Sequence, residues 1–579
     1  MTSGDPDRFT AGPDSRSCRP AYQPTQPTLR AGPDTGHTGG VDSSPSCQSP
    51  APDWLLEEGE RGNPGSGIDR RQPDGRAWTG GNQVVVHVDG ALYFRRLLEV
   101  AEGLGRGDTI SLTDWRGDPD ERLDGPGTEI AEVLCRAARR GAAVRGLVWR
   151  SHLDRFRFSA GENRHLEEEV NAAGGELLLD QRVRFGGSHH QKLVVVRRAG
   201  GEDVAFVGGI DLCHSRRDDA DHAGDPQAQP MAVVYGPAPP WHDIQMEVHG
   251  PAVGALDATF RERWGDPAPL SRNPFALAAD LVRGDDRRAS RLPPAPPDPP
   301  SCGPHAVQVL RTYPNRHPGY PFAPRGERSV ARAYVKALGR ARRLVYVEDQ
   351  YLWSAEVARV FAEALRREPA LRLVAVVPRY PDRTGRLATP LAVVGRNRAI
   401  GLLRAAAGDR VAVYDAENRA GTPIYVHAKV CVVDDVWASV GSDNVNRRSW
   451  SHDSELSCAV LDETRDGRAP ADPGGLGDGA RVFARGLRLR LWREHLGRAE
   501  GDDADLLDPE TGAAAFARAA AALDRWHAAG REGQRPPGHV RPHAVTTLSG
   551  LQRAWATPLY RLACDPDGRP LPLRVRGRW

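Results

Sequence analysis

The stretch IYVHAKVCVVDD, residues 424–435, decides the fold of this chain of 579 residues. It places His427 and Lys429 two positions apart in a predicted strand, so both side chains project from one face. The residues that alternate with them are apolar and face the other way. Two potential cations on a buried strand are costly unless an anion lies beside them. The stretch therefore predicts an anion-binding site on a buried strand.

A second copy of this pattern occurs in the first half of the chain. SHHQKLVVV, residues 188–196, contains His190 and Lys192 at the same spacing. The segments that follow the two copies match in order and residue type: VAFVGGID (204–211) and WASVGSDN (437–444), then WHDIQMEV (241–248) and SHDSELSCAV (451–460), then a predicted helix. Such a repeat predicts two similar halves related by a pseudo-twofold axis, with equivalent elements meeting at their interface.

Helix and strand patterns alternate around the two copies. Helices are predicted at 88–105, 127–142, 327–341, 355–367, 396–408 and 513–530, strands at 108–115, 143–150, 343–353, 371–378 and 410–415, and a helix followed by a strand within 162–180. This alternation favours an α/β fold with a mostly parallel sheet.

Composition divides the chain into five segments. The first is rich in Gly, Pro, Ser, Thr and Asp and poor in apolar residues, which predicts disorder, and a later Pro-rich stretch predicts a stiff, extended linker. The expected segments are a disordered tail (1–50), a first lobe (51–290), the linker (291–304), a second lobe (305–500) and a C-terminal extension that packs on the second lobe (501–579).

Charge and cysteine content exclude several classes of protein. Lys and Arg number 78 and Asp and Glu 76, which argues against a broadly basic surface for nucleic acid. The eight cysteines are scattered, with no spacing typical of a zinc site or a disulfide framework. No apolar run reaches the ~18 residues of a membrane-spanning helix, and the N-terminus has no apolar core of a signal peptide. We expect a cytoplasmic protein.

The repeated residues suit chemistry at a phosphodiester. A neutral imidazole can attack phosphorus, while a second, protonated imidazole donates a proton to the leaving oxygen. Lysines can offset the charge on the non-bridging oxygens, so neither a metal nor another cofactor is expected. The candidate catalytic residues are His190, Lys192, His427 and Lys429.

Carboxylates on the strand after each motif are candidates for orienting these imidazoles. Asp453 and Glu455 share one strand face, and one of them is expected to hold a ring nitrogen of His427. Asp243 and Gln245 are taken as their counterparts in the first half. We expect Asp243 and Glu455 to be the orienting residues, with Asp453 as the rival in the second half.

Further site residues are proposed with less specific signals. Asp434 closes the second motif and is expected to have a supporting role, and the candidates for phosphate contact are Asn444, Ser442 and Asp211. Five other histidines lie near the motifs at irregular spacing, which does not favour a metal site: His189, His214, His222, His242 and His452.

The pattern His-x-Lys-x4-Asp, formed by His427, Lys429 and Asp434, resembles the HKD motif of the phospholipase D superfamily. GSDNVNRRS (441–449) resembles the segment that follows the motif in that superfamily, and VAFVGGIDLCHSRRDD (204–219) is similar to its eukaryotic-type members in particular. The resemblance spans about residues 80 to 500. The resemblance implies two similar lobes, each a mixed sheet sandwiched by helices, with one active site between them. It also implies that His190 is the nucleophile and His427 the acid and base.

The first motif departs from this pattern. Arg197 stands where the motif has its Asp, and RRAGGED (197–203) predicts a longer hairpin turn. Glu202 and Asp203 are candidates to replace the missing carboxylate in a different register.

The resemblance implies a metal-independent phospholipase D-like phosphodiesterase. Its substrate would be the headgroup phosphodiester of a glycerophospholipid at a membrane surface, with transfer to an alcohol through the same phosphohistidine intermediate. Both motifs lie in one chain, so a monomer is expected. The alternatives are a cardiolipin synthase-like phosphatidyltransferase, an HKD-type nuclease, although no specific nucleic acid is expected, and an inactive lipid-binding module.

Overall fold

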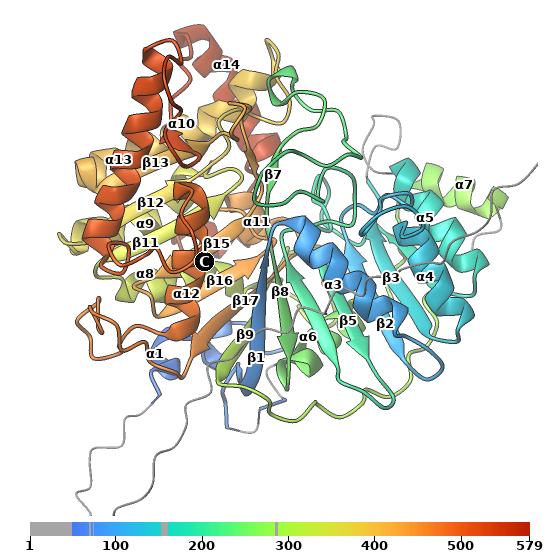
Figure 1. The fold of residues 1–579 in the computed structure, drawn as a ribbon. Coiled ribbons are helices and arrows are strands. Elements are labelled where there is room, and N and C mark those ends of the chain that lie inside the picture. Colours follow the sequence, from blue (N-terminus) through green and yellow to red (C-terminus); the bar gives the residue numbers. More distant parts are fainter. Residues whose placement is uncertain (1–48, 69–70, 73, 152–159, 284–287) are drawn as a thin grey trace, which may run out of the picture. The chain divides into compact units, whose positions relative to one another are not determined.

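The computed structural model of the protein describes residues 49–579 except for 69–70, 73, 152–159 and 284–287. The tail predicted for residues 1–50 therefore lies outside the described residues, apart from its last two. The described residues form one large mixed sheet that is covered by helices on both faces, and a separate sheet of two short strands (Figure 1).

The first half of the sheet and its helices follow one another in short connections. Two short helices, α1 (Ala51–Trp54) and α2 (Glu58–Arg61), precede it. Its elements are β1 (Thr79–Val88), α3 (Gly90–Glu102), β2 (Thr109–Asp114), α4 (Ile130–Arg139), β3 (Ala143–Trp149), α5 (Ala160–Ala172), β4 (Glu176–Asp180), β5 (Leu193–Arg197), β6 (Val204–Gly208), β7 (Trp241–His242), β8 (Ile244–His249), α6 (Ala252–Trp264) and α7 (Pro274–Arg283).

The second half repeats this order and is followed by a C-terminal extension. Its elements are β9 (His305–Tyr313), β10 (Glu327–Arg328), α8 (Ser329–Arg340), β11 (Leu344–Asp349), α9 (Ala355–Arg367), β12 (Arg372–Val376), α10 (Ala388–Ala407), β13 (Val411–Ala416), β14 (Tyr425–Val426), β15 (Lys429–Val433), β16 (Trp437–Gly441), α11 (Arg447–Ser451), β17 (Glu455–Asp462) and α12 (Val482–Leu496). The extension contains α13 (Pro509–Ala528), β18 (Val540–Pro542), α14 (Gly550–Leu559) and α15 (Leu571–Val575).

The strand order shows the repeat directly. From the junction between β9 and β1, one half runs β9-β17-β16-β15-β11-β12-β13 and the other β1-β8-β6-β5-β2-β3-β4. The junction is antiparallel, with Asn82 opposite His305. The prediction of two similar halves with a mixed sheet is confirmed.

The expectation of a mostly parallel sheet is wrong. Parallel pairing within the large sheet joins β2 to β3, β3 to β4, β11 to β12 and β12 to β13, whereas the strands around the motifs pair antiparallel. Helices connect the parallel strands, but β15 and β16 are joined by a tight turn, which permits only antiparallel pairing.

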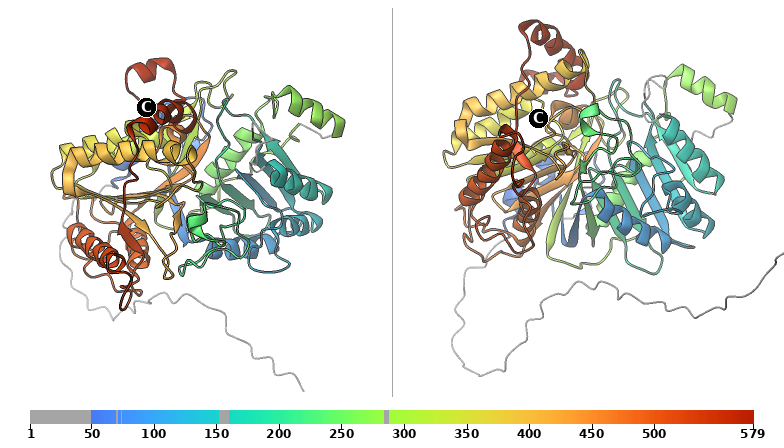
Figure 2. Two further views of the ribbon diagram at one scale, coloured as in Figure 1. Left: turned by 90° about the horizontal axis from the view of Figure 1, so that it is seen from above. Right: turned by 45° about the horizontal axis from the view of Figure 1, so that its top comes forward.

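Three apolar clusters hold the layers together. Helices α3 and α4 pack on one face of the first half, and α8 and α9 on the same face of the second. On the opposite face, α6 and α12 share one core with strands of both halves, through side chains such as Phe260 and Trp492. Figure 2 shows the helices lying on both faces of the twisted sheet. The shared core therefore links the halves in addition to the β1–β9 pairing.

Local sequence explains the helix boundaries. Ser354 caps α9 by accepting a hydrogen bond from the backbone N–H of Val357, and the buried residues of α9 recur with helical spacing. Helix α10 begins eight positions before the predicted segment 396–408, because its first turns pack against Tyr560 of the C-terminal extension. The long-range contact extends a helix that local sequence alone placed too late.

The terminal segments and the linker attach to different halves. Trp54 donates its indole N–H to Asp478 at 3.0 Å, and α1 contacts α8, so this segment lies on the second half although it was assigned to the first lobe. Residues 291–304 contain no helix or strand, and Arg197 of the first half donates to the carbonyl of Pro297. In the C-terminal extension, β18 pairs with β13. Among the described residues, every helix is too short or too polar to cross a bilayer.

Candidate active site

The two motifs converge on one cavity. His190 and His427 both line a cavity of about 380 Å³, together with the aromatic side chains of Trp241, Tyr351 and Tyr425. The two histidines are 237 positions apart in the chain. The pseudo-twofold arrangement predicted from the repeat thus brings the equivalent imidazoles to the same space.

Each motif docks on a strand of the opposite half. The backbone N–H of His427 donates to the carbonyl of His242 at 2.8 Å, in the parallel pair of β14 with β7. The backbone N–H of His190 donates to the carbonyl of Ser454 at 2.9 Å, beside a parallel bridge between His189 and Ser454. These two equivalent contacts fix both histidines at the interface between the halves.

The orienting carboxylates are exchanged between the halves. Nδ1 of His190 lies 2.8 Å from Oε2 of Glu455, and Nδ1 of His427 lies 2.6 Å from Oδ2 of Asp243. The expectation that a carboxylate of the second half holds His427 is therefore wrong. Because Nδ1 of each ring is engaged, Nε2 is the ring nitrogen that remains for chemistry.

The sheet register also corrects the match between the two carboxylate strands. Gly208 pairs with Gln245 and Gly441 pairs with Ser457, so Gln245 corresponds to Ser457. Asp243 therefore corresponds to Glu455, two positions away from the match made by sequence. The sequence comparison failed here because Asp453 and Glu455 are both acidic and lie two positions apart, so either could be matched to Asp243.

Asp453 is committed to other partners. It accepts hydrogen bonds from the backbone N–H of Ser188 at 3.0 Å, from the Ser188 hydroxyl at 2.9 Å and from Nε of Arg448 at 2.6 Å. These contacts hold the first motif against the second half. The structure therefore pairs Glu455, and not its rival Asp453, with an imidazole of the two motifs.

The two lysines differ in whether a carboxylate balances their charge. Nζ of Lys192 lies 2.9 Å from Oδ1 of Asp211, and it donates to the carbonyl of His190 at 3.1 Å. Lys429 contacts the carbonyl and, at 2.9 Å, Nδ1 of His427, and it forms no ion pair within 4.0 Å with a described residue. The position equivalent to Asp211 is occupied by neutral Asn444, which explains the difference.

Arg216 supplies a further cation that sequence reasoning did not single out. It donates to Oδ2 of Asp211 at 3.1 Å, and its guanidinium lies 4.0 Å from the centre of the Trp241 ring. It lines the same cavity as the two histidines. The available signal was its place in HSRRDD, directly after the glycine-rich end of β6.

The candidates for phosphate contact lie in different surroundings. The hydroxyl of Ser442 donates to Oε2 of Glu455 at 2.6 Å and accepts the N–H of Leu456, so it positions the carboxylate. Asn444 lines an adjoining cavity of about 420 Å³ that also reaches His190. Its Oδ1 has no hydrogen-bond partner among the described residues. The structure thus leaves the amide of Asn444 with capacity to bind a ligand.

Burial shifts the pKa values of the catalytic candidates. Burial, followed by the charge of the neighbouring lysine, lowers the pKa of both His190 and His427 well below 6.5. Burial raises the pKa of Glu455 well above 4.5 and lowers that of Lys429 to about 8. All these shifts disfavour charge on the buried groups, and a bound anion would favour the cationic forms of the histidines and lysine.

Asp434 has a structural place at the end of the second motif. Its carboxylate accepts the backbone N–H groups of Arg342 at 2.7 Å and of Arg343 and Leu344 at 2.8 Å, just before β11. In the first half, the donor and the acceptor of the equivalent contact are exchanged between the two segments. Asp108, before β2, accepts the N–H of Ala199 in the hairpin that follows the first motif.

Arg197 pairs with Asp203 in the hairpin where the first motif lacks its aspartate. Its Nε lies 3.0 Å from Oδ2 of Asp203, which also accepts the N–H of Arg198 at 2.7 Å. Of the two candidates in this turn, Asp203 stabilises the hairpin, whereas Glu202 lies 3.1 Å from His249. The first motif therefore keeps its strand geometry with a different set of charges.

Two pairs of aromatic rings line the adjoining cavity. Trp115 stacks on Trp149 at 5.7 Å, and Tyr351 lies against Trp353 at 3.9 Å. Because His190, Trp115 and Tyr351 belong to both cavities, the aromatic space opens directly beside the imidazole.

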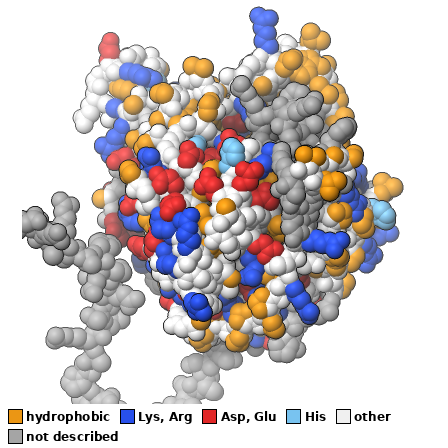
Figure 3. Space-filling view, turned by 90° about the vertical axis from the view of Figure 1, so that its right-hand side faces the viewer, with side chains coloured by type: hydrophobic (Ala, Val, Ile, Leu, Met, Phe, Trp, Pro, Cys, Tyr) orange, Lys and Arg blue, Asp and Glu red, His pale blue; other side chains and the backbone are white. Residues whose placement is uncertain are grey.

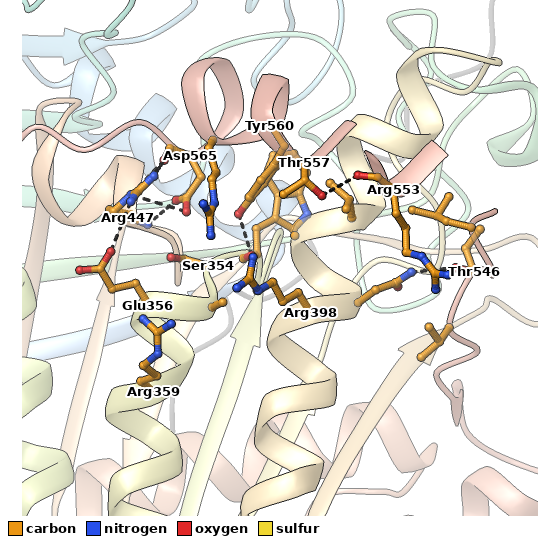
Figure 4. Close-up of a pocket in the computed structure, with 18 of the residues that line it drawn as sticks. Ser354, Glu356, Arg359, Arg398, Arg447, Thr546, Arg553, Thr557, Tyr560 and Asp565 are labelled. Atoms are coloured by element: carbon orange, nitrogen blue, oxygen red, sulfur yellow. Dashed lines mark hydrogen bonds and ion pairs between the residues drawn. The ribbon is translucent and has the colours of Figure 1, made fainter. Parts of the chain in front are cut away.

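A separate cavity of about 670 Å³ is lined by residues of α9, α10 and the C-terminal extension (Figure 4). Arg398 and Arg553 approach it from opposite sides, and Tyr560 lies above it. It contains no residue of the two motifs.

Comparisons with known proteins agree with this geometry. Residues 122–359 and 405–547 match the family described as phospholipase D, and residues 334–466 match the family described as cardiolipin synthase, PLD-like domain. Phospholipase D alpha 2 of Oryza sativa subsp. japonica is 27% identical, covering 69% of this chain and 63% of the relative. Phospholipase D alpha 1 of Arabidopsis thaliana is 27% identical, covering 68% and 61% respectively.

The chain thus spans about three fifths of the length of these relatives. Among solved structures, a phosphatidylserine synthase of Haemophilus influenzae matches with a TM-score of 0.45 and 13% identity, over 66% of this chain and 82% of that chain. The family match covers more than half of the chain and includes both motifs. The chain therefore belongs to the phospholipase D family.

Proposed function

We propose that the protein cleaves the headgroup phosphodiester of a glycerophospholipid, passing the phosphatidyl group through a phosphohistidine to water or to an alcohol. One observation carries this proposal: two imidazoles line one cavity, and a carboxylate of the opposite half holds Nδ1 of each. The plant relatives that the chain matches are named phospholipase D. Phospholipid at a membrane surface is the proposed substrate.

The first step joins His190 to phosphorus. Nε2 of neutral His190 attacks, the bond between phosphorus and the headgroup oxygen breaks, and protonated His427 gives its proton to that oxygen. Lys192, Lys429 and Arg216 supply positive charge for the non-bridging oxygens, so the step uses no metal ion. Burial keeps His190 neutral, and the substrate anion favours the protonated form of His427.

The second step reverses this transfer. Neutral His427 takes the proton of an incoming water or alcohol, whose oxygen attacks phosphorus. The bond between phosphorus and Nε2 breaks, and the electron pair returns to His190. Hydrolysis yields phosphatidic acid, and transfer yields a new phosphodiester. His190 is assigned as the nucleophile because it borders both cavities, which leaves room for a lipid on its aromatic side.

A substrate with a good leaving group tests this order. Phosphatidyl-p-nitrophenol releases p-nitrophenolate without needing a proton, so His427→Ala is expected to give one equivalent of product in a burst and then stall. His190→Ala is expected to give no burst. His189→Ala, which alters the neighbouring histidine, is the control and should turn over. A burst in His190→Ala but not in His427→Ala would overturn the order of the two histidines. The absence of a burst in both variants would overturn the phosphohistidine intermediate.

Phosphatidyl transfer is the second candidate, favoured by the match of residues 334–466 to the cardiolipin synthase domain. It differs only in the acceptor that reaches His427. Product analysis with phosphatidylglycerol or ethanol as acceptor, in competition with water, distinguishes the two. Mainly transferred product would make the protein a phosphatidyltransferase.

A nuclease is disfavoured by the distribution of charge. Figure 3 shows Lys and Arg side chains interspersed with Asp and Glu on one face of the molecule. Backbone recognition of nucleic acid relies on clustered cations and gives steep salt dependence. Binding of DNA that weakens steeply with salt would favour the nuclease instead.

A further inference from the structure

A second cluster of titratable side chains lies beside the active site and takes no part in the proposed reaction. It consists of Asp89, His222, His242 and Glu494, whose ligand atoms all lie within 4.8 Å of one another. Asp89 lies between β1 and α3, His222 in the loop before β7, His242 on β7 and Glu494 on α12. The cluster therefore joins both halves of the molecule.

The ligand atoms of the cluster lie close enough together to share one metal ion. Nδ1 of His242 lies 3.1 Å from Oδ1 of Asp89 and 3.0 Å from Oε1 of Glu494, which lies 3.4 Å from Nε2 of His222. Tetrahedral zinc with bonds of about 2.0–2.2 Å holds its ligand atoms roughly 3.3–3.6 Å apart, so binding would move Nδ1 of His242 away from Asp89 and Glu494 by a few tenths of an ångström. Oε1 of Glu494 makes no hydrogen bond of ordinary geometry with any described residue. We propose that these four residues bind a Zn²⁺ ion.

The outer contacts of both histidines support this assignment. Nε2 of His242 lies 2.8 Å from Oε2 of Glu348, and Nδ1 of His222 lies 3.1 Å from the carbonyl of Trp241. A metal-bound histidine commonly donates its other ring N–H to a carboxylate or a carbonyl. The atoms nearest Glu494 are Nδ1 of His242, which is hydrogen-bonded to Oδ1 of Asp89 at 3.1 Å, and Nε2 of His222. A metal ion would take the place of the proton between His242 and Asp89, and both nitrogens would then be lone-pair donors to it.

Glu348 is itself held in place. Nε2 of His495 lies 2.7 Å from its Oε1, and the hydroxyl of Tyr346 donates to the same oxygen. Glu348 is fully buried on β11. A carboxylate fixed in this way orients the ring of His242, as in a carboxylate–histidine–zinc arrangement.

Charge and backbone geometry point the same way. A divalent ion balances the charges of Asp89 and Glu494 while both imidazoles stay neutral, whereas a metal-free cluster must hold protons on its histidines. Asp89 and His222 have φ angles of 67° and 50°, which are rare for residues other than glycine. Such conformations are strained and persist where the surroundings require them.

The ion would have a structural role. Four protein ligands close a tetrahedral site and leave no position for substrate. His242 precedes Asp243, which holds His427, and the carbonyl of His242 accepts the N–H of His427 at 2.8 Å. Zinc would thus fix β7 and the second imidazole. The inference does not rest on the proposed function, because the ligands alone carry it.

Metal analysis of the purified full chain tests the site. We expect close to one zinc ion per chain in protein purified without chelators, and loss of that ion in His222→Gln and Glu494→Gln. His539→Gln is the matched control, since its ring packs edge-on against His222 at 5.6 Å but its Nδ1 is bonded to the carbonyl of Glu417. This variant should retain zinc.

Two measurements on the wild-type chain keep the test decisive if a variant does not fold. Dipicolinate treatment should lower Tm, and Zn²⁺ but not Mg²⁺ should restore it. Co²⁺ added to the stripped chain should give the intense visible absorption of a tetrahedral complex. The proposed site would be overturned if the wild-type protein holds no zinc, its Tm does not rise with added Zn²⁺, and Co²⁺ gives no tetrahedral spectrum. Zinc retained in both ligand variants would overturn the ligand set.

Discussion

Oε2 of Glu455 lies 2.8 Å from Nδ1 of His190, although the two residues belong to opposite halves of the chain. The hydroxyl of Ser442 donates to the same oxygen at 2.6 Å. The carboxylate is therefore set by its own half and acts on the imidazole of the other. In the proposed mechanism, this arrangement makes the interface between the halves a condition of catalysis.

Glu455→Gln is expected to lower kcat by about 100-fold or more while the protein stays folded, because the amide does not fix the reactive tautomer of His190. The measurement is kcat with a short-chain phospholipid, with circular dichroism as the check of folding. Asp453→Asn is the matched control, since Asp453 pairs with Arg448 and Ser188. An equal loss of kcat in both variants would show that Glu455 has no special role.

Lys429 is expected to set an alkaline limit on activity. Burial lowers its pKa from 10.5 to about 8, so its charge is present at neutral pH and is lost as pH rises through about 8. Because that charge offsets the charge of the phosphate in the proposed reaction, kcat/KM should fall above this pH. The check is the profile of kcat/KM against pH in wild type and in Lys429→Arg, whose cation does not titrate there. The alkaline decrease in kcat/KM should disappear in the variant. A wild-type profile that stays flat well beyond pH 8 would contradict the assignment to Lys429.

Arg216→Lys is expected to lower kcat/KM by about tenfold, since a lysine cannot lie over Trp241 and also donate to both Asp211 and the carbonyl of His214. Arg217→Lys serves as the control, because Arg217 lies 4.0 Å from Asp225 and does not line the cavity of the two histidines. Steady-state kinetics of both variants checks this. Activity unchanged in Arg216→Lys would remove Arg216 from the set of phosphate-binding cations.

Asp434→Ala is expected to reduce the free energy of unfolding by about 2–4 kcal/mol, since three backbone N–H groups, one buried and two half-buried, lose their acceptor. Asp434→Asn should lose less, because asparagine tolerates the φ angle of 51° and keeps one acceptor. Urea unfolding measures both. The activity per folded molecule should stay close to wild type, and a selective loss of kcat would show that Asp434 acts in the reaction itself.

The repeat made much of this architecture predictable. Matching segments after His190 and His427 indicated two halves and one shared site, and the alternation of helices and strands located most elements. Local sequence could not give strand direction around the motifs, which depends on which strands meet in space. It also placed the start of α10 too late, because contact with Tyr560 stabilises the first turns.

The site was predictable in its residue types but not in its pairings. Spacing alone identified both histidines and lysines, whereas the exchange of Glu455 and Asp243 between the halves depends on the docking of β14 on β7. The ligands of the proposed zinc site come from positions 89, 222, 242 and 494, a spacing that no local motif reveals. His222 and His242 were therefore set aside by sequence reasoning, and only the fold brings them to Glu494.

The exchanged carboxylates also bear on how such a chain can originate. A polypeptide with a single motif would lack the opposite half that supplies the carboxylate for its imidazole. It would have to assemble with an identical copy to complete each imidazole–carboxylate pair. Gene duplication and fusion would turn that assembly into one chain and release its copies from strict identity. Asp211 against Asn444, and Arg197 against Asp434, are the divergence that such a fusion permits.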